Sequence, residues 1–390
     1  MKMNKKTLII IAAAVVVVLA VVLAVVLAGG NKTPDATTTT TTTTTKKTAG
    51  NNPVVTGDYT LGMGVAFGDH KNGEINATVA TVVLDANGKI LACKIDALQN
   101  KFAVDFDGEA VNFTNLKTKK ELGYGYNMST WGASMDNNGD GIVKEWFEQV
   151  AAFENYVVGK TAAEVAAIPQ KTLGEEYGST AGYVIAADDA LLSAGCTIQV
   201  QEFMNAVVLA CNDAQAVKFA AVDSFTLGVA ANNGDNGTAF NDDGVAVKLN
   251  SDFAAVVVVD GKIAAALNDA YQPAVSIDWE GAVTSVNVGK KDITTGADLG
   301  LMTKRELKEN YAMAGKVDNN NDGIKLEWYL QSAAFSAHIV GMTGAEVAAM
   351  ETTFVNNHYI STDADLLAAG CSIQITGIME VVAEAFANAQ

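Results

Sequence analysis

The chain repeats itself from about residue 54 onward, and this duplication limits its possible folds more than any other feature. Five short motifs occur twice in the same order, with insertions that change the spacing between them. The matched pairs are 59–62 and 225–228, 88–90 and 261–263, 118–122 and 303–307, 145–146 and 327–328, and 163–167 and 345–349. Because the period is far longer than that of a solenoid repeat, we expect two tandem homologous domains, at 54–217 and 218–390.

Each copy begins with strand signals and continues with helix signals. Residues 78–84 and 254–259 are rich in β-branched side chains, and both lead into a turn that ends in glycine, which is typical of a hairpin. Apolar side chains then follow helical spacing after Trp146 and after Trp328. The sequence therefore predicts an α+β fold, in which each domain has an antiparallel sheet followed by packed helices.

A capping-box spacing marks the start of one short helix in each copy. Thr161 is followed three positions later by Glu164, and Thr343 is followed in the same way by Glu346. In such a box the threonine hydroxyl accepts from a backbone N–H, and the glutamate carboxylate accepts from the threonine N–H. We expect a helix to begin directly after each threonine.

The first 30 residues have the features of a transmembrane anchor. Lysines at 1–6 precede residues 7–28, which carry no charged side chain. These twenty-two residues would span about 33 Å as a helix, close to the thickness of a bilayer core. The preceding lysines predict a single pass through the cell membrane, with the bulk of the chain extracytoplasmic. A cleaved signal peptide is the alternative, although its apolar region is usually only about 7–15 residues long.

A threonine-rich linker is expected at 31–53, because the nine consecutive threonines at 37–45 cannot bury a core. Beyond residue 47 the chain holds 20 basic and 43 acidic side chains, within a total formal charge of −18. A surface that acidic argues against a nucleic-acid partner. Four cysteines do not make a disulfide scaffold in a chain of this length, and a bond between Cys93 and Cys211 remains open.

A turn of small residues with a hydroxyl is written twice, each time shortly before an apolar, helix-like stretch. It reads Ala-Gly-Cys-Thr at 194–197 and Ala-Gly-Cys-Ser at 369–372. Backbone N–H groups at the start of a helix carry partial positive charge, so an anion could bind beside such a turn. A purely structural role for the glycine, cysteine and hydroxyl is the alternative.

The order of these motifs resembles the FMN-binding domain of bacterial membrane-associated redox proteins, present here in two tandem copies. Members occur in ion-pumping redox complexes and in extracellular electron transfer on Gram-positive cell surfaces. In that family a Ser-Gly-Ala-Thr turn carries FMN through a phosphoester on the threonine. The resemblance implies Thr197 and Ser372 as acceptors, Gly195 and Gly370 as turn glycines, and Met128 and Met313 as candidate wall residues of the flavin site.

A second duplicated constellation has the spacing of the first half of an EF-hand-type calcium loop. Oxygen-bearing side chains stand at positions one, three and five, and a glycine and an isoleucine follow. The candidate ligands are Asp136, Asn138, Asp140, Ile142 and Glu145 in the first copy, and Asp318, Asn320, Asp322, Ile324 and Glu327 in the second. Each glutamate stands at position ten instead of twelve. An Asn/Asp/Gly turn that binds no metal is the alternative.

Two functional hypotheses follow from these motifs. The first is a membrane-anchored flavoprotein that transfers electrons to redox partner proteins at the cell surface, without a catalytic residue set of its own. The second is a flavin-free, calcium-stabilised cell-surface module of the same fold, with a binding or structural role. The leucines at 191 and 366 favour the second hypothesis, because the family carries an aspartate six residues before the acceptor. The retained hydroxyls of Thr197 and Ser372 and the Thr-Lys-Lys-Glu-Leu segment favour the first, which is the function that we expect from the sequence.

Overall fold

The computed structural model describes residues 58–68, 73–114, 116–128, 143–234 and 236–389. The expected anchor at 1–30 and linker at 31–53 lie outside the described residues, so both stay predictions. Within the described part, no helix combines the length and apolar character that crossing a membrane requires. Val55–Gln390 forms one compact unit, which contains both copies of the repeat.

The first half of this unit begins with long strands and continues with short helices. The strands are β1 (Tyr59–Phe67), β2 (Glu74–Leu84), β3 (Ile90–Asp105) and β4 (Ala110–Thr114). The helical part comprises α2 (Lys119–Leu122), the 3-10 turn η1 (Gly123–Tyr126), α3 (Trp146–Val157) and α4 (Ala162–Ala166). The half ends with β5 (Gln170–Thr172), η3 (Glu175–Thr180), β6 (Val184–Ala186), α5 (Asp189–Ser193), α6 (Gln201–Cys211) and β7 (Val217–Phe219).

The second half repeats this order and adds a hairpin. Its strands are β8 (Thr226–Asn233), β9 (Gly237–Asn241), β10 (Gly244–Lys248), β11 (Ser251–Val259), β12 (Lys262–Tyr271), β13 (Ala274–Ile277) and β14 (Val283–Asn287). The elements that follow are α7 (Lys304–Leu307), η4 (Lys308–Tyr311), α8 (Trp328–His338), α9 (Gly344–Ala348), β15 (Thr352–Val355), β16 (His358–Ser361), α10 (Ala364–Ala368) and α11 (Thr376–Asn388). Thr161 and Thr343 cap α4 and α9 through the predicted capping boxes, so this prediction is confirmed.

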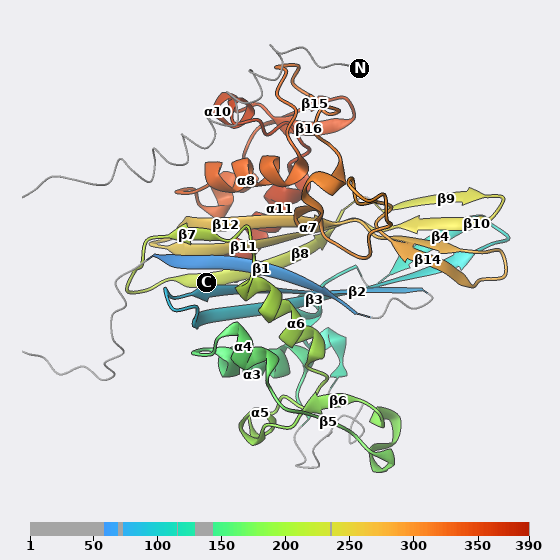
Figure 1. Ribbon diagram of the computed structural model, residues 1–390, viewed down its shortest axis with the longest axis vertical. Helices are drawn as coiled ribbons and strands as arrows, with labels where there is room; N and C mark the ends of the chain where they lie inside the picture. Colours follow the sequence, from blue (N-terminus) through green and yellow to red (C-terminus); the bar gives the residue numbers. More distant parts are fainter. Residues whose placement is uncertain (1–57, 69–72, 115, 129–142, 235, 390) are drawn as a thin grey trace, which may run out of the picture. The chain divides into compact units, whose positions relative to one another are not determined.

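Two antiparallel sheets lie face to face between two layers of helices (Figure 1). The first sheet has the strand order β4-β3-β2-β1-β7, and the second has the order β12-β11-β8. Helices α3, α4 and α6 cover the outer face of the first sheet, and α8, α9 and α11 cover that of the second. The expected α+β class with antiparallel sheets and packed helices is confirmed.

The inner faces of the two sheets share one apolar core. Leu61 and Val83 from the first half pack in the same cluster as Phe253 and Leu267 from the second. The rings of Phe67 and Tyr271 lie 4.2 Å apart across this interface, centroid to centroid. Burial of this kind is the main favourable contribution to folding, so the two halves stabilise each other through their sheets.

Equivalent glycines let a helix lie directly on each sheet. A side chain at Gly62 in β1 would overlap the carbonyl group of Ala210 in α6. A side chain at Gly228 in β8 would overlap the carbonyl group of Ala385 in α11. Both positions require a residue without Cβ because the backbones approach so closely. The repeated glycine of the Leu-Gly motif therefore fixes the same helix-on-sheet packing in both halves.

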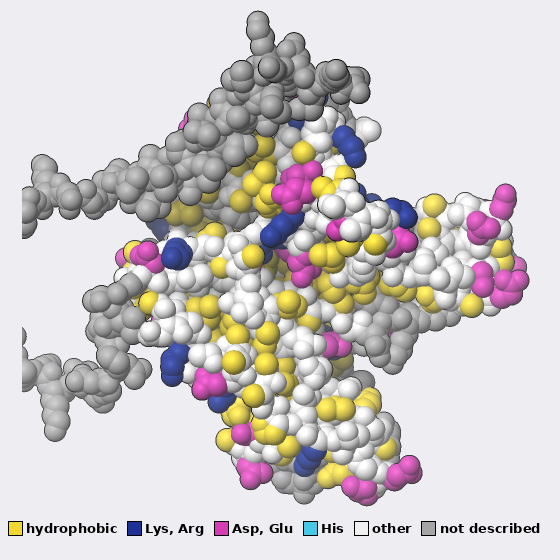
Figure 2. All heavy atoms as spheres, viewed as in Figure 1, with side chains coloured by type: hydrophobic (Ala, Val, Ile, Leu, Met, Phe, Trp, Pro, Cys, Tyr) yellow, Lys and Arg dark blue, Asp and Glu magenta, His cyan; other side chains and the backbone are white. Residues whose placement is uncertain are grey.

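The added hairpin of the second half builds a smaller sheet of order β14-β13-β10-β9. Figure 2 shows acidic side chains grouped at the far end of this arm, where Asp242 and Asp243 form the exposed turn between β9 and β10. The inner end of β10 carries Lys248 instead, close to the start of β11. The arm therefore brings a lysine, which the first half lacks at the equivalent position, toward the main sheet.

Candidate functional site

The hydroxyl turn of the first half is tied to helix α3 by a buried glutamine. The Thr197 N–H donates to Gln149 Oε1 at 2.8 Å, and the Thr197 hydroxyl lies 3.3 Å from the same oxygen. Gln149 is 0% exposed and Thr197 is 1% exposed. The hydroxyl that the family resemblance implies as a flavin acceptor therefore faces the interior, beneath α3.

The second half repeats this arrangement with a different glutamine. The Ser372 N–H donates to Gln331 Oε1 at 2.8 Å. Gln331 is 0% exposed and Ser372 is 2% exposed. One difference separates the halves: Ser372 Oγ has no hydrogen-bond partner among the described residues. A buried hydroxyl without a partner carries a desolvation cost that no hydrogen bond offsets, so the Ser372 hydroxyl is less favourably placed than that of Thr197.

The same glutamine joins the methionine and glutamate motifs in the first half. Gln149 Nε2 lies 3.5 Å from Met128 Sδ and donates to the carbonyl of Lys144 at 2.9 Å. The Met128 N–H in turn donates to Glu145 Oε2 at 2.9 Å. Glu145 is buried and directly precedes α3 as its N-terminal cap residue. Met128 and Glu145, expected in a flavin wall and a metal loop respectively, belong to one polar network.

The network recurs in the second half with only small changes. Gln331 Nε2 lies 4.0 Å from Met313 Sδ. Glu327 accepts from the N–H of Met313 at 3.0 Å and from that of Ala314 at 2.9 Å. The sequence reasoning missed the two glutamines at the centre. Their signal is a Trp-x-x-Gln spacing, since each glutamine follows the first tryptophan of its helix by three positions.

The turn glycines are required by backbone conformation. Gly195 has a φ of +85° and Gly370 a φ of +87°, a region that residues with a side chain rarely adopt. The side chain of Lys144 covers Gly195, and its Nζ donates to the carbonyl of Ala194 at 2.7 Å. Ile324 and Leu326 cover Gly370. Both turns are therefore closed by the residues that precede α3 or α8.

The calcium-like loop of the second half lies directly on its hydroxyl turn. Asn319, which is buried, donates through Nδ2 to the carbonyl of Ser372 at 2.8 Å. Within the loop, Asp318 accepts from the N–H groups of Asp322 and Gly323 at 3.1 and 3.0 Å. The two constellations that the sequence presents separately are thus one structural unit, in which the loop covers Ser372.

The expected calcium ligands are only partly assembled in this loop. Asn320 Nδ2 donates to Asp322 Oδ2 at 2.7 Å, and the Ile324 N–H donates to Asp322 Oδ1 at the same distance. Glu327, the expected closing ligand, turns both carboxylate oxygens to the Met313 and Ala314 amides. Calcium prefers six to eight oxygen ligands, so the set present does not by itself complete a site.

Calcium binding stays a prediction in both halves. Asp136, Asn138, Asp140 and Ile142 lie outside the described residues, so only Glu145 of the first set is placed. Over the described ranges, no three histidine, cysteine or acidic side chains converge in a way that could hold a metal ion.

All four cysteines are free thiols in the structure. The bond between Cys93 and Cys211 that the sequence left open is therefore not formed. Burial raises the pKa of Cys211 to about 11 and the pKa of Cys196 and of Cys371 to about 12. A thiol with such a pKa stays protonated near neutral pH and is a poor nucleophile. The cysteines of the two turns act as small buried groups.

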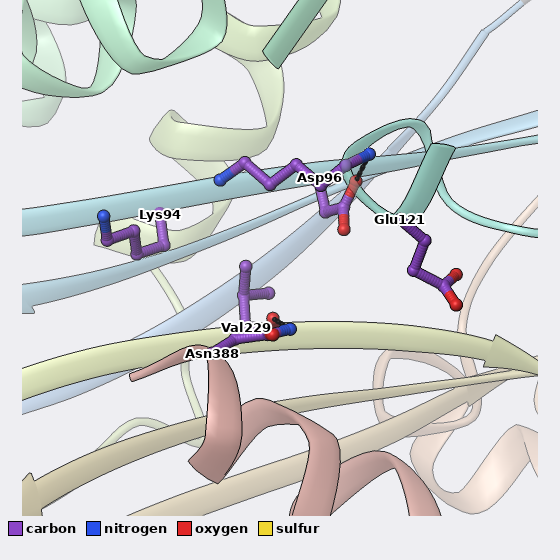
Figure 3. Close-up of a pocket in the computed structure, with 6 residues that line it drawn as sticks. Lys94, Asp96, Glu121, Val229 and Asn388 are labelled. Atoms are coloured by element: carbon purple, nitrogen blue, oxygen red, sulfur yellow. Dashed lines mark hydrogen bonds between the residues drawn. The ribbon is translucent and has the colours of Figure 1, made fainter. Parts of the chain in front are cut away.

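A cavity of about 240 Å³ lies where the two halves meet. Figure 3 shows its lining residues: Lys94 and Asp96 from β3, Lys120 and Glu121 from α2, Val229 from β8 and Asn388 from α11. Lys120 Nζ pairs with Glu154 at 2.6 Å, and Lys94 Nζ lies 3.7 Å from the same carboxylate. Burial raises the pKa of Asp96 to about 6, although Lys120 acts in the opposite direction. Most charges on this wall are therefore compensated within the first half.

The equivalent position on the other side of the interface is filled by an ion pair. There Arg305 replaces Lys120 and Asp213 replaces Asn388, and Arg305 Nη2 lies 3.0 Å from Asp213 Oδ2. Lys120 instead turns to Glu154 of its own half. The ion pair between the halves is thus present at the Arg305 position, whereas at the cavity Lys120 pairs within its own half.

Covalent FMN on a threonine or serine needs a hydroxyl that the phosphate and an attaching enzyme can reach. Thr197 and Ser372 do not meet this condition, because both are buried and packed under α3 or the Asp318–Glu327 loop. A groove of about 490 Å³ does run along α3, lined by Lys144, Asn155 and Ala194 among others, but Thr197 is not part of its wall. The described geometry does not fit a flavin ester at either hydroxyl.

Part of the chain is similar to a curated protein. A chlorophenol reductase from Desulfitobacterium hafniense is 34% identical over 110 residues, which cover 25% of this chain and 31% of that protein. The chain thus spans about a third of the length of the curated relative it matches. No family model matches the chain, and no solved structure matches it.

Proposed function

We propose that this chain is a flavin-free descendant of the FMN-binding-domain fold, built from two tandem homologous domains and working as a binding or structural module. The burial of Thr197 and Ser372 carries this proposal. Both turns are held by glutamines that use the backbone N–H of the acceptor residue, so the turn has a structural task that needs no cofactor. The aspartate that precedes the acceptor in the family is also replaced, by Leu191 and Leu366.

The module is proposed to act outside the cytoplasm, held at the cell membrane by its N-terminal segment. The support comes from the charge-free stretch at 7–28 behind a basic leader, together with the threonine-rich spacer that follows. Expression of the full chain with a C-terminal tag, followed by membrane fractionation and protease treatment of intact cells, tests this placement. A tagged chain that remains in the cytosolic fraction would contradict it.

The flavin question is decided by one measurement on residues 53–390. The protein is produced in a host that supplies the flavin-attaching enzyme, and its visible absorbance and intact mass are recorded. We expect a colourless protein of unmodified mass. A known covalently flavinylated protein, co-expressed in the same cells, controls for the activity of the attaching enzyme. A mass increase that maps to Thr197 or Ser372 would overturn the proposal.

A second candidate function is electron transfer by flavin attached at Ser372. One structural observation favours it: Ser372 Oγ is buried without a hydrogen-bond partner, so the native fold does not use this hydroxyl. This function would require the loop that carries Asn319 to open. The intact-mass experiment separates the candidates, since Ser372→Ala would abolish labelling only under the second.

A further inference from the structure

Three lysines from separate segments of the second half converge on one small cavity. The cavity has a volume of about 130 Å³. Its polar wall consists of Lys248 at the end of β10, Lys290 after β14, Lys304 at the start of α7, Gln272 after β12 and Tyr311 at the end of η4. The chain has a formal charge of −18, so three lysines around one cavity stand out from its acidic composition and suggest a specific role for this cluster.

Tyr311 organises two of these lysines. Lys290 Nζ donates to the Tyr311 carbonyl at 2.7 Å and lies 4.3 Å from the centre of its ring. Lys304 Nζ lies 5.2 Å from the same ring and 5.1 Å from the ring of Trp328. Burial lowers the pKa of Lys290, and the neighbouring charges of Lys316, Lys304 and Lys248 lower it further. The lysines therefore repel one another, which a bound anion would relieve.

The carboxylates near this cluster are engaged elsewhere. Among the described residues, none of Lys248, Lys290 and Lys304 forms an ion pair within 4.0 Å. Asp269 accepts from the N–H groups of Ala270 and Arg305, and Glu327 from those of Met313 and Ala314. Asp252 lies near Lys304 beyond ion-pair distance and raises the pKa of that lysine. Among the described residues no carboxylate pairs directly with the three lysines, although Asp269 and Glu327 offset part of their charge from beyond ion-pair distance, raising the pKa of Lys304 and of Lys290 respectively.

The first half shows how the same site looks when the chain supplies its own anion. Tyr126 donates to Gln99 at 3.1 Å, as Tyr311 donates to Gln272 at 3.2 Å. Glu74 occupies the position of Lys248: it pairs across the sheet with Lys101, as Lys248 pairs with Ala274. Glu74 accepts from Gln99 Nε2 at 2.7 Å and lies 3.9 Å from Lys101 Nζ.

The second half therefore replaces a built-in carboxylate with a lysine and adds Lys290. We propose that the Lys248–Lys290–Lys304 cavity binds a small tetrahedral oxyanion of the phosphate class, either free or as the terminal phosphate of a larger molecule. Lysine ammonium groups supply charged donors for such a group, whereas Gln272 Nε2 already donates to Asn250 Oδ1 at 2.7 Å. A cavity of about 130 Å³ accommodates the oxyanion alone. Lys248 is exposed, so the rest of a bound phosphomonoester would extend into solvent on the side of this lysine. This inference does not depend on whether flavin is bound.

The test is calorimetric titration of residues 53–390 with inorganic phosphate at low ionic strength, and in parallel with glycerol 3-phosphate. Lys248→Glu restores the residue type of the first half and should weaken binding at least about tenfold, because a carboxylate would occupy the anion position. Lys290→Gln provides a second variant that removes charge without introducing an acid, and it should weaken binding as well. The matched control is Lys171→Glu on β5, an exposed position with the same change in charge.

The expected result is one phosphate bound by the wild type and by Lys171→Glu, with binding weakened in both cavity variants while their circular dichroism spectra stay unchanged. Tighter binding of glycerol 3-phosphate would assign the site to a phosphomonoester, and equal binding would assign it to the free anion. The proposal is overturned if the wild type binds neither ligand at millimolar concentration. Equal weakening by Lys171→Glu would also overturn it, since the attraction would then be one of overall charge.

Discussion

Arg305 of the second half forms a buried ion pair with Asp213 of the first half, with Arg305 Nη2 3.0 Å from Asp213 Oδ2 and the two side chains 6% and 8% exposed. The same guanidinium donates to the carbonyl of Gln215 at 3.1 Å, and Asp213 Oδ2 accepts from the Met63 N–H at 3.1 Å. This pair joins α7 of one half to β1 and the end of α6 in the other. The two halves are therefore joined by this ion pair as well as by the apolar core between their sheets.

Removal of one partner of this pair should destabilise the protein strongly. Arg305→Ala leaves the Asp213 carboxylate buried without its counter-charge, and the loss should be about 3–5 kcal/mol in the free energy of unfolding. Urea denaturation followed by tryptophan fluorescence measures it. The matched control is Lys291→Ala, because Lys291 and Asp298 also lie 3.0 Å apart but have 67% and 81% exposed side chains. That loss should be about 0–1 kcal/mol, and comparable losses in the two variants would contradict the assigned role.

The buried glutamines should be structural residues that the hydroxyl turns depend on. Gln149→Leu removes the acceptor of the Thr197 N–H, and leaving that buried group without a partner should cost about 1–3 kcal/mol. Thr197→Val keeps the N–H and removes only the hydroxyl, so it should cost less. Thermal unfolding of both variants checks the order. If Thr197→Val proved the more damaging change, the hydroxyl and not the glutamine–backbone contact would organise the turn.

The repeat itself explains why so much of the fold could be predicted. Strand and hairpin signals written twice, with capping threonines at 161 and 343, are local patterns that specify local structure. The packing of the two sheets against each other could not be predicted in this way. It depends on which face of each strand meets the other half, and the buried strands are apolar on both faces, as the pattern of β2 shows. The Arg305–Asp213 pair depends in turn on that packing.

The candidate site likewise has local features that the sequence predicts and features that depend on tertiary packing. Gly195 and Gly370 were recognisable because a turn demands glycine, and both adopt positive φ. The burial of Thr197 could not be predicted from the sequence. It arises from the contact with Gln149 in α3, which lies 48 positions away along the chain. The two halves also differ at single positions, such as Glu74 in the first half and Lys248 in the second. The sequence alone could not show that these two residues are equivalent, because the equivalence follows from the register of the strands.

Calcium should bind the loop of the second half weakly. Asp318, Asn320 and Asp322 offer side-chain oxygens, but Glu327 is committed to the Met313 and Ala314 amides, so the closing ligand is missing. We expect a dissociation constant of about 10⁻⁴–10⁻³ M, the range of weak extracellular calcium modules. Calorimetric titration of wild type and Asp318→Asn measures it, and the variant should lose the heat that binding to this loop contributes. A micromolar constant would show that Glu327 leaves its amides to bind the metal.

The stability of the protein should fall as pH rises from about 4 to about 7, because of Asp269. Burial raises the pKa of this carboxyl from 3.8 to about 7, against the opposing influence of Arg305 and a hydrogen bond from Thr303. The folded state therefore holds a proton that the unfolded chain has already released in this range, and that contribution is complete only below the ordinary pKa. Asp269→Asn keeps an acceptor for the Ala270 and Arg305 N–H groups but cannot ionise.

The free energy of unfolding of Asp269→Asn should consequently depend less on pH than that of the wild type across this range. Urea denaturation at four pH values between about 4 and about 8 gives the two slopes. Burial raises the pKa of Asp96 to about 6 and that of Glu384 to about 7, and both residues remain in both proteins, so a residual slope is expected across the range. Asp298→Asn removes an exposed carboxylate and serves as the control. Equal slopes in wild type and Asp269→Asn would show that Asp269 is already ionised in the folded protein, held in that state by Arg305.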